Sequence, residues 1–276
     1  MIFSKNVYLR AIFCSLFIVV LLFACGKNEI KLLKDQEVIV KEKLCYLKSA
    51  NQGHGIIYNF SYDVKNQLTQ IEGFPDFDFI TYENGLPKKA TNSLDKSYYV
   101  GFDYDAKGAL SQISFVGKDS RGKAFEFKSK VYTNTKKQIE KIDLLLPVFD
   151  EVVVTKIEYD AIGNTKKISL IEGTKTRTVL ENLTFDDKKS PYLNTPFANV
   201  MAYFIIFSST IGAENTTYFS NRNNVTSAKI YSDNGDILYN YKHEYNPEGY
   251  VIKTKVTRKG DGQEQNYEET YVYDCK

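Results

Sequence analysis

The sequence predicts an all-β protein: a large up-and-down meander of antiparallel strands, curled or closed into a barrel-like shell, with one inserted apolar helix. Turn signals recur at a spacing of about ten to fourteen residues, which corresponds to about 16 short strands joined by hairpins. The segments between the turns alternate apolar and polar residues, and one apolar stretch interrupts them. A sheet of that size curls, splits or closes rather than staying flat.

The first 24 residues have the features of a secretory signal. The segment MIFSKNVYLR contains Lys5 and Arg10 and no acid, and the apolar segment AIFCSLFIVVLLFA follows at residues 11–24. That apolar segment is too short for a comfortable membrane span. We therefore expect residues 1–24 to be removed and the protein to be exported.

The residues Leu22-Phe23-Ala24-Cys25 resemble the lipobox of bacterial lipoproteins, with Phe23 where a small residue is usual. The resemblance implies that Cys25 is acylated, and residues 25–40 would then form a tether. Since no Pro-rich, Gly/Ser-rich or low-complexity linker follows residue 40, we expect residues 41–276 to form one soluble domain. The acyl chains would be the membrane attachment. The expected location is the outer membrane, on its periplasmic or its cell-surface side. The alternative is an ordinary signal followed by a chance cysteine.

Charge argues against a nucleic-acid partner. The chain has 36 Lys and Arg against 34 Asp and Glu, and Lys5 and Arg10 lie in the expected signal, so the remaining chain is neutral. Binding to nucleic acid needs at least a basic patch. We expect none.

The segment FDYDAKGALSQI (102–113) shows the repeating hairpin unit. Asp105 stands at the first position of a type I turn, where its side chain can bond the backbone two residues on. Gly108 takes the left-handed position that ends the turn. The same chemistry is expected at Asp63 with Asn66, at Asp160 with Gly163, and at Gly235 and Gly249.

Segments between the turns have the period of half-buried strands. In KAFEFKSKVY, Phe125 and Phe127 share one face while Glu126 and Lys128 share the other. One stretch breaks this period: Thr195-Pro196 is typical of a helix start, apolar residues follow at helical spacing, and Gly212 is a stop signal. We expect a buried helix at about 196–211, with a buried strand pair as the alternative.

The hairpin unit resembles the Tyr-Asp repeats of Rhs-type shells. FDDKKSPY (185–192), an apolar stretch and SNRNNVTSAKIY (220–231) resemble the signature of Bacteroidetes lipoproteins that share a domain of unknown function with a porin-like barrel fold. Tyr192 stands where Phe or Leu is usual, and the unit near Asn134 lacks its Gly. The resemblance implies a barrel-like antiparallel shell with a helix packed inside it, and it implies no activity.

No sequence motif points to catalysis, a metal or a cofactor: GxSxG, HExxH, CxxC, the P-loop and the dinucleotide fingerprint are all missing. We expect neither metal nor cofactor. His243 shares a predicted strand face with Tyr239, Tyr241 and Tyr245. These four are candidates to face a ligand, and the alternative is an imidazole packed in an aromatic row.

The leading hypothesis is a non-enzymatic envelope lipoprotein whose β-shell binds or scaffolds a glycan or a partner protein. One rival is a hydrolase that uses carboxylates, for which an inward pair about 5–9.5 Å apart would be the sign. A second rival is a structural subunit of an outer-membrane complex, which predicts a contiguous exposed apolar patch.

Two cysteines remain for the domain, Cys45 in its first predicted strand and Cys275 in its last. An oxidising compartment favours their pairing, but these strands become neighbours only if the meander closes. A bridge is feasible if their Cα atoms lie within about 7 Å. The alternative is two buried free thiols.

Overall fold

The structure, a computed structural model, describes residues 43–53, 55–74, 77–118, 121–146, 151–194, 215–233, 235–260 and 262–276. These residues form 16 strands and a short 3-10 helix, η2 (Thr217–Phe219). The strands are β1 (Cys45–Asn51), β2 (Ile57–Tyr62), β3 (Leu68–Glu72), β4 (Phe79–Glu83), β5 (Leu86–Thr91), β6 (Tyr99–Tyr104), β7 (Leu110–Lys118), β8 (Ala124–Thr133), β9 (Ile139–Leu146), β10 (Glu151–Tyr159), β11 (Thr165–Glu172), β12 (Lys175–Lys189), β13 (Asn223–Ile230), β14 (Ile237–Tyr245), β15 (Val251–Gly260) and β16 (Gln263–Cys275).

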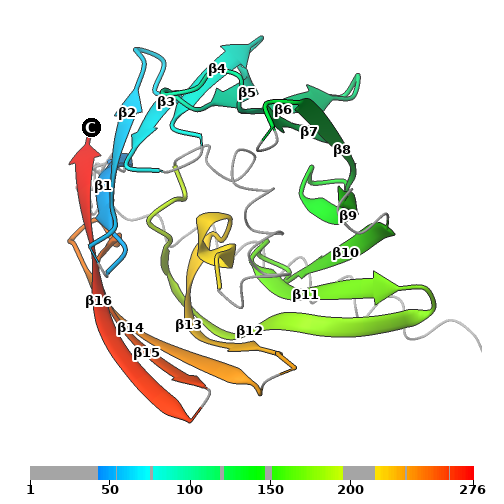
Figure 1. Ribbon diagram of the computed structural model, residues 1–276. Helices are drawn as coiled ribbons and strands as arrows, with labels where there is room; N and C mark the ends of the chain where they lie inside the picture. Colours follow the sequence, from blue (N-terminus) through cyan, green and yellow to red (C-terminus); the bar gives the residue numbers. More distant parts are fainter. Residues whose placement is uncertain are drawn as a thin grey trace, which may run out of the picture. The chain divides into compact units, whose positions relative to one another are not determined.

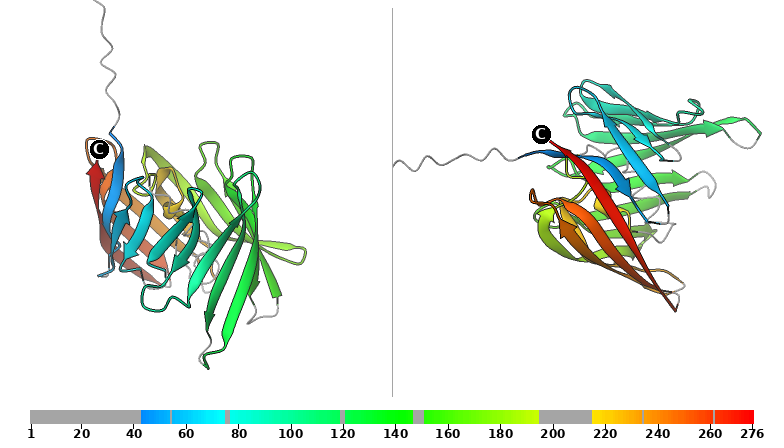
Figure 2. Two further views of the ribbon diagram at one scale, coloured as in Figure 1. Left: turned by 90° about the horizontal axis from the view of Figure 1, so that it is seen from above. Right: turned by 90° about the vertical axis from the view of Figure 1, so that its left-hand side faces the viewer.

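Each strand pairs antiparallel with its neighbours in sequence, and β1 pairs with β16 to close a barrel (Figure 1). The two further views also place β1 beside β16 (Figure 2). The predicted all-β fold and its antiparallel meander are therefore confirmed. The pairing of the first strand with the last decides between the curled and the closed sheet that the sequence left open.

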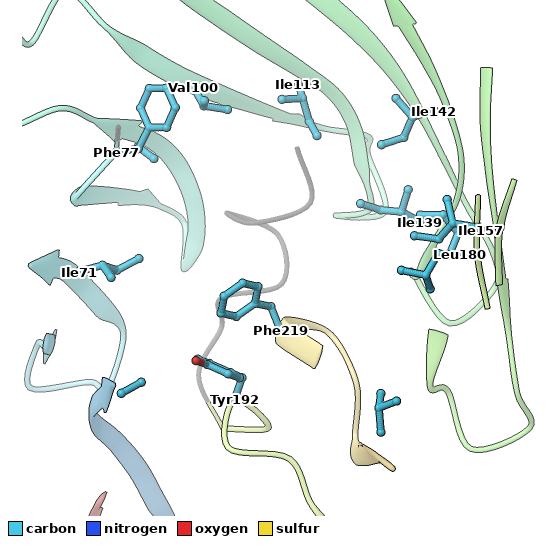
Figure 3. Packing of buried hydrophobic residues seen from close by; sticks show 14 of the residues in the cluster. Ile71, Phe77, Val100, Ile113, Ile139, Ile142, Ile157, Leu180, Tyr192 and Phe219 are labelled. Atoms are coloured by element: carbon cyan, nitrogen blue, oxygen red, sulfur yellow. The ribbon is translucent and has the colours of Figure 1, made fainter. Parts of the chain in front are cut away.

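Side chains alternate between the inside and the outside of the barrel. On β16, Glu268 and Thr270 are exposed, whereas Glu269 and Tyr271 are buried. Figure 3 shows inward-pointing side chains of the wall around two aromatic residues, Tyr192 and Phe219, that come from the connection between β12 and β13. The labelled wall residues are Ile71, Phe77, Val100, Ile113, Ile139, Ile142, Ile157 and Leu180. The described part of the interior is therefore a packed apolar core.

The connection that supplies Tyr192 and Phe219 spans residues 190–222, between β12 and β13. Tyr192 and Phe219 are buried, with ring centroids 4.7 Å apart. The predicted helix at 196–211 falls on residues 195–214 of this connection, which lie outside the described residues. The helix stays a prediction.

Buried amides hold the far end of this connection against the wall. Asn182 Nδ2 donates to the carbonyl of Thr165 at 2.6 Å and to Thr217 Oγ1 at 2.8 Å. Asn215 Nδ2 donates to Asn182 Oδ1 at 3.0 Å, and the Thr165 amide donates to Asn221 Oδ1 at 2.8 Å. Most of these polar groups pair with one another, which limits the cost of burying them; the exception among them is Asn221 Nδ2, which is buried without a hydrogen-bond partner in the described residues.

The hairpin turns have a shared geometry. Asp105 Oδ1 accepts from the amides of Lys107 at 2.8 Å and Ala109 at 2.9 Å, and Gly108 has φ +70°. The corresponding left-handed residues have φ +58° at Asn66, +107° at Gly163, +118° at Gly235 and +83° at Gly249. In the unit that lacks its glycine, Lys137 takes the position with φ +62°. The aspartates Asp63 and Asp160 accept from backbone amides as Asp105 does.

Tyrosines before these turns bridge strands that have separated. The β5–β6 ladder ends at the pair Lys89 and Gly101. Three residues beyond Gly101, the Tyr104 hydroxyl donates to the carbonyl of Pro87, two residues before Lys89, at 2.7 Å. The hydroxyl thus supplies a hydrogen-bond donor to a carbonyl that lies beyond the end of the strand ladder.

This offset recurs around the barrel. In each case a side chain three residues past the last ladder pair donates to a carbonyl two residues before that pair on the preceding strand. The further tyrosine contacts are Tyr62 with Leu47 (2.8 Å), Tyr82 with Leu68 (2.8 Å), Tyr159 with Ile139 (2.7 Å) and Tyr273 with Val251 (2.6 Å). We call this the tyrosine bridge; it gives the Tyr of the Tyr-Asp unit a structural role.

Candidate functional site

The four ligand-facing candidates on β14 form one row of rings. Tyr239 and Tyr241 stack with centroids 5.9 Å apart, Tyr241 and His243 stack at 6.3 Å, and His243 and Tyr245 lie 6.2 Å apart. Of the four, Tyr241 and His243 line a cavity in the barrel. The structure therefore combines both interpretations: the imidazole is packed in an aromatic row, and part of that row faces a cavity.

His243 makes the same kind of bridge between β13 and β14, two residues before Tyr245, the tyrosine that directly precedes its turn. The β13–β14 ladder ends at Ser227 and Asn240, and His243 Nε2 lies 2.9 Å from the carbonyl of Val225, the same offset as in the tyrosine bridges. His243 Nδ1 lies 2.9 Å from Thr254 Oγ1. A carbonyl can only accept, so Nε2 carries the proton and Nδ1 accepts from the threonine hydroxyl. Burial lowers the pKa of His243 because it disfavours the charged ring.

Tyr245 is held by a carboxylate. Its hydroxyl donates to Asp186 Oδ2, and the Asn224 side-chain amide donates to Asp186 Oδ1 at 3.2 Å. Burial, followed by the hydrogen bond to Asp186, raises the pKa of the Tyr245 hydroxyl. The hydroxyl therefore stays protonated as the donor to Asp186.

The cavity that Tyr241 and His243 line contains a carboxyl group that the sequence analysis missed. Glu269 is only 8% exposed, and its Oε2 accepts from the Tyr271 hydroxyl at 2.7 Å. Burial raises the pKa of Glu269 to about 7, which the Tyr271 hydrogen bond partly opposes. Near neutral pH both the neutral and the ionised form of this carboxyl group are therefore populated.

We call this space the Glu269 cavity. Its volume is about 30 Å³, and Asn215 and Tyr218 contribute to its lining from the β12–β13 connection. A water molecule needs about 10–15 Å³ in this measure, so the space suits small polar molecules of the size of water. Among the described residues that line it, Glu269 is the one carboxylate. The pair that the hydrolase hypothesis requires is not found among them.

A second opening lies between β1 and β2, where the two strands diverge. We call it the β1–β2 cleft; its volume is about 470 Å³. Its lining includes four aromatic side chains, Tyr46, Phe60, Tyr62 and Tyr273. Ammonium, carboxylate and amide groups are added by Lys48, Asp63, Asn66, Asp274 and Lys276. Two of the predicted turn residues, Asp63 and Asn66, are thus part of a cleft.

The remaining predicted residues lie elsewhere. Cys45 and Cys275 face each other across the β1–β16 pair and are joined by a disulfide, with 3.9 Å between their Cα atoms. This is within the 7 Å limit set above. Cys25 and the proposed tether lie outside the described residues.

The described residues meet neither the requirements of a metal site nor those of a membrane-spanning helix. No group of three or more His, Cys, Asp or Glu side chains there is placed to hold a metal ion. In the same residues, no helix has the length and apolar character needed to cross a membrane.

A sequence signal for Glu269 existed. Tyr267, Glu269, Tyr271 and Tyr273 alternate in QNYEETYVYDC, so one glutamate shares an otherwise aromatic strand face. Because alternate residues of a strand share one face, this pattern places the carboxyl group on the inner face with the tyrosines. The β1–β2 cleft has no comparable signal, because it depends on where a ladder stops.

Comparison with known proteins adds two structural likenesses. No family model and no curated protein matches the chain. A porin-like protein from Bacteroides uniformis ATCC 8492 is 15% identical over 85% of this chain and 96% of its own, with a TM-score of 0.48. A chain of the TcdB2-TccC3-Cdc42 structure is 12% identical over 77% of this chain and 9% of its own, with a TM-score of 0.28. The barrel assignment rests on the strand pairing itself.

Proposed function

We propose that this protein is an exported, lipid-tethered β-barrel that works outside the bilayer as a non-enzymatic binding module of the cell envelope. The proposal combines the signal and Cys25 in the sequence with the polarity of the barrel wall. Its ligand is a glycan or a partner protein.

The polarity of the wall carries the proposal. The inward side chains form a largely apolar core, with polar groups around the β12–β13 connection, while the outer surface carries ion pairs, for example between Lys253 and Glu268 at 2.7 Å and between Lys259 and Glu264 at 2.8 Å. A membrane-spanning barrel has the opposite arrangement, with an apolar outer band and a polar interior. Charged side chains on β15 and β16 therefore favour a wall that faces water.

The disulfide and the cavities support the rest of the proposal. A bond between Cys45 and Cys275 fits an oxidising compartment such as the periplasm or the cell surface. The Glu269 cavity offers one carboxylate among its described residues, whereas glycoside hydrolysis uses two. Binding needs no such pair.

The tether is tested by the Cys25→Ala substitution. Without the sulfur that would carry the acyl chains, the protein should leave the membrane fraction and appear in the soluble fraction. Cys14→Ala, a cysteine of the signal, is the matched control and should stay membrane-bound. Recovery of the Cys25→Ala protein in membranes after a carbonate wash would contradict a barrel that lies outside the bilayer.

A further inference from the structure

The β1–β2 cleft exists because two strands of the wall separate. Their ladder joins Ser49–Asn51 to Ile57–Asn59. Towards the start of β1 and the end of β2 the strands diverge, and the cleft of about 470 Å³ opens between them. Its volume falls within the range of about 300–1,000 Å³ that is typical of small-molecule sites.

Backbone groups along this opening are already used. The carbonyl of Leu47 accepts from the Tyr62 hydroxyl at 2.8 Å, and the carbonyl of Cys45 accepts from the Asn194 side-chain amide at 3.0 Å. An extended peptide that added to the β1 edge would find these acceptors occupied. Recognition in the cleft must therefore come from side chains.

The aromatic side chains of the cleft are held in place. Tyr46 and Tyr62 meet edge to face with ring centroids 5.6 Å apart. The hydroxyls of Tyr62 and Tyr273 are fixed by their tyrosine bridges, and Tyr273 also packs against Tyr250 at 5.3 Å. Rigid rings lose little conformational entropy when a ligand binds against them.

The polar side chains supply donors and acceptors without a net charge. Lys276 Nζ lies 3.4 Å from Asn66 Oδ1 and 3.8 Å from Asp274 Oδ2. With Lys48 and Asp63, the cleft has two ammonium groups and two carboxylates. A strongly anionic or cationic ligand would meet a like charge as well as an opposite one, so a neutral ligand is favoured.

We propose that the β1–β2 cleft is a binding site for a neutral saccharide. The faces of a sugar ring are apolar and pack against aromatic rings, while its hydroxyls both donate and accept. Tyrosine rings beside carboxylate, amide and ammonium groups match both properties. This inference rests on the proposed function and names the ligand class of that binding module.

The first experiment applies the protein to a printed array of neutral, sialylated and sulfated glycans. It uses the full chain with the substitution Cys25→Ser, which removes the proposed site of acylation. Neutral glycans should bind, and isothermal titration calorimetry with the best of them should give its Kd. Tyr46→Ala and Asp274→Ala should each weaken binding at least tenfold. Tyr99→Ala is the matched control, because Tyr99 is also a half-buried tyrosine beneath a lysine ammonium, here Lys89, but lies outside the cleft. It should leave the Kd unchanged.

Circular dichroism and the melting temperature establish that each variant is folded before its Kd is compared. Failure of every neutral glycan, binding confined to charged glycans, or an unchanged Kd in folded Tyr46→Ala protein would each overturn the saccharide site. Co-purification of a partner protein from native membranes, in the absence of any glycan binding, would overturn this inference and leave the proposed binding module standing.

Discussion

At the scale of single residues, the tyrosine bridge explains why the repeating unit begins with Tyr. The hydroxyl reaches a carbonyl that the diverging ladder leaves behind, as Tyr104 does for Pro87 at 2.7 Å. His243 shows that the requirement is a hydrogen-bond donor of similar reach, because its Nε2 serves the carbonyl of Val225 in the same way. The histidine therefore has a structural role, and it also lines the Glu269 cavity.

Removing one bridge should have a measurable cost. Tyr104→Phe keeps the ring but leaves the carbonyl of the buried Pro87 without its donor, so unfolding should become easier by about 1 kcal/mol. Urea denaturation measures the loss. Tyr99→Phe is the control, because the Tyr99 hydroxyl has no hydrogen-bond partner among the described residues. Its free energy of unfolding should stay close to that of the wild type. Equal losses in the two variants would show that the bridge contributes nothing.

Glu269 is the residue that should make stability depend on pH. Its pKa is about 7 in the folded protein against 4.5 for an unburied glutamate, so the folded state binds the proton more tightly. The resulting stabilisation is complete below pH 4.5 and is lost as the pH rises through 7, with a total of about 3 kcal/mol.

Glu269→Gln removes this titration while keeping a side chain of similar size. The difference in unfolding free energy between the wild type and Glu269→Gln should therefore vary between pH 4 and pH 8, with the wild type losing relative stability as the pH rises. Taking the difference cancels the contributions of other titrating groups. One of these is Asp160: burial raises its pKa, but hydrogen bonds from Asn164 and neighbouring amides outweigh this effect and lower the pKa. A difference that stays constant over this range would refute the assignment.

At the scale of elements, the hairpin turn is defined by its backbone rather than by one residue type. Gly108 and Lys137 occupy the same position of their turns with φ +70° and +62°. Each turn also uses an oxygen of its first side chain, Asp105 or Asn134, to accept from the backbone amides. The hydrogen bonds that the Asn134 side chain accepts can therefore hold the turn together without the glycine, although Lys137 must then adopt an unfavourable positive φ.

Exchanging the residue at this position tests the cost of the left-handed backbone. A Cβ on Gly108 would have Lys137 Nζ at 3.5 Å and Leu86 Cδ1 at 3.9 Å, which are ordinary contacts. Gly108→Val should therefore destabilise mainly through its φ, by about 1–3 kcal/mol. Lys137→Gly should stabilise by up to about 1 kcal/mol. Melting temperatures that do not move in opposite directions would contradict the shared turn geometry.

At the scale of the whole molecule, closure joins the two ends of the domain. Strand β1 pairs with β16 from Cys45 opposite Cys275 to Asn51 opposite Thr270. The disulfide adds a covalent link across a sequence separation of 230 residues. A cross-link of that span restricts the unfolded chain strongly, by up to about 5 kcal/mol in the chain-entropy model.

The double substitution Cys45→Ala and Cys275→Ala should lower the urea midpoint without opening the barrel, because the β1–β16 ladder remains. The free energy of unfolding should fall by about 2–5 kcal/mol. Dithiothreitol should lower the midpoint of the wild type and leave that of the double variant unchanged. Thiol labelling of denatured, unreduced protein checks the bond directly: two reactive cysteines in the domain would reject it.

Much of the fold was readable from the sequence because it is set by neighbours along the chain. A turn residue at positive φ and a period of two depend on local backbone geometry, so Asp105 with Gly108 and the alternation of β8 were predictable. The same period placed Tyr241 and His243 on one face. It did not lead to Glu269, although the alternating tyrosines of β16 carried that signal.

Tertiary structure decided what depends on groups far apart in sequence. Cys45 and Cys275 meet only because β1 pairs with β16, and no local pattern distinguishes a closed sheet from a curled one. The pKa of Glu269 is set by burial that the whole wall creates, together with the β12–β13 connection inside it. The β1–β2 cleft arises where a ladder stops, and its chemistry joins turn residues of one hairpin to the last residues of the chain. Turn chemistry and side-chain period are local, whereas burial, closure and clefts are properties of the assembled barrel.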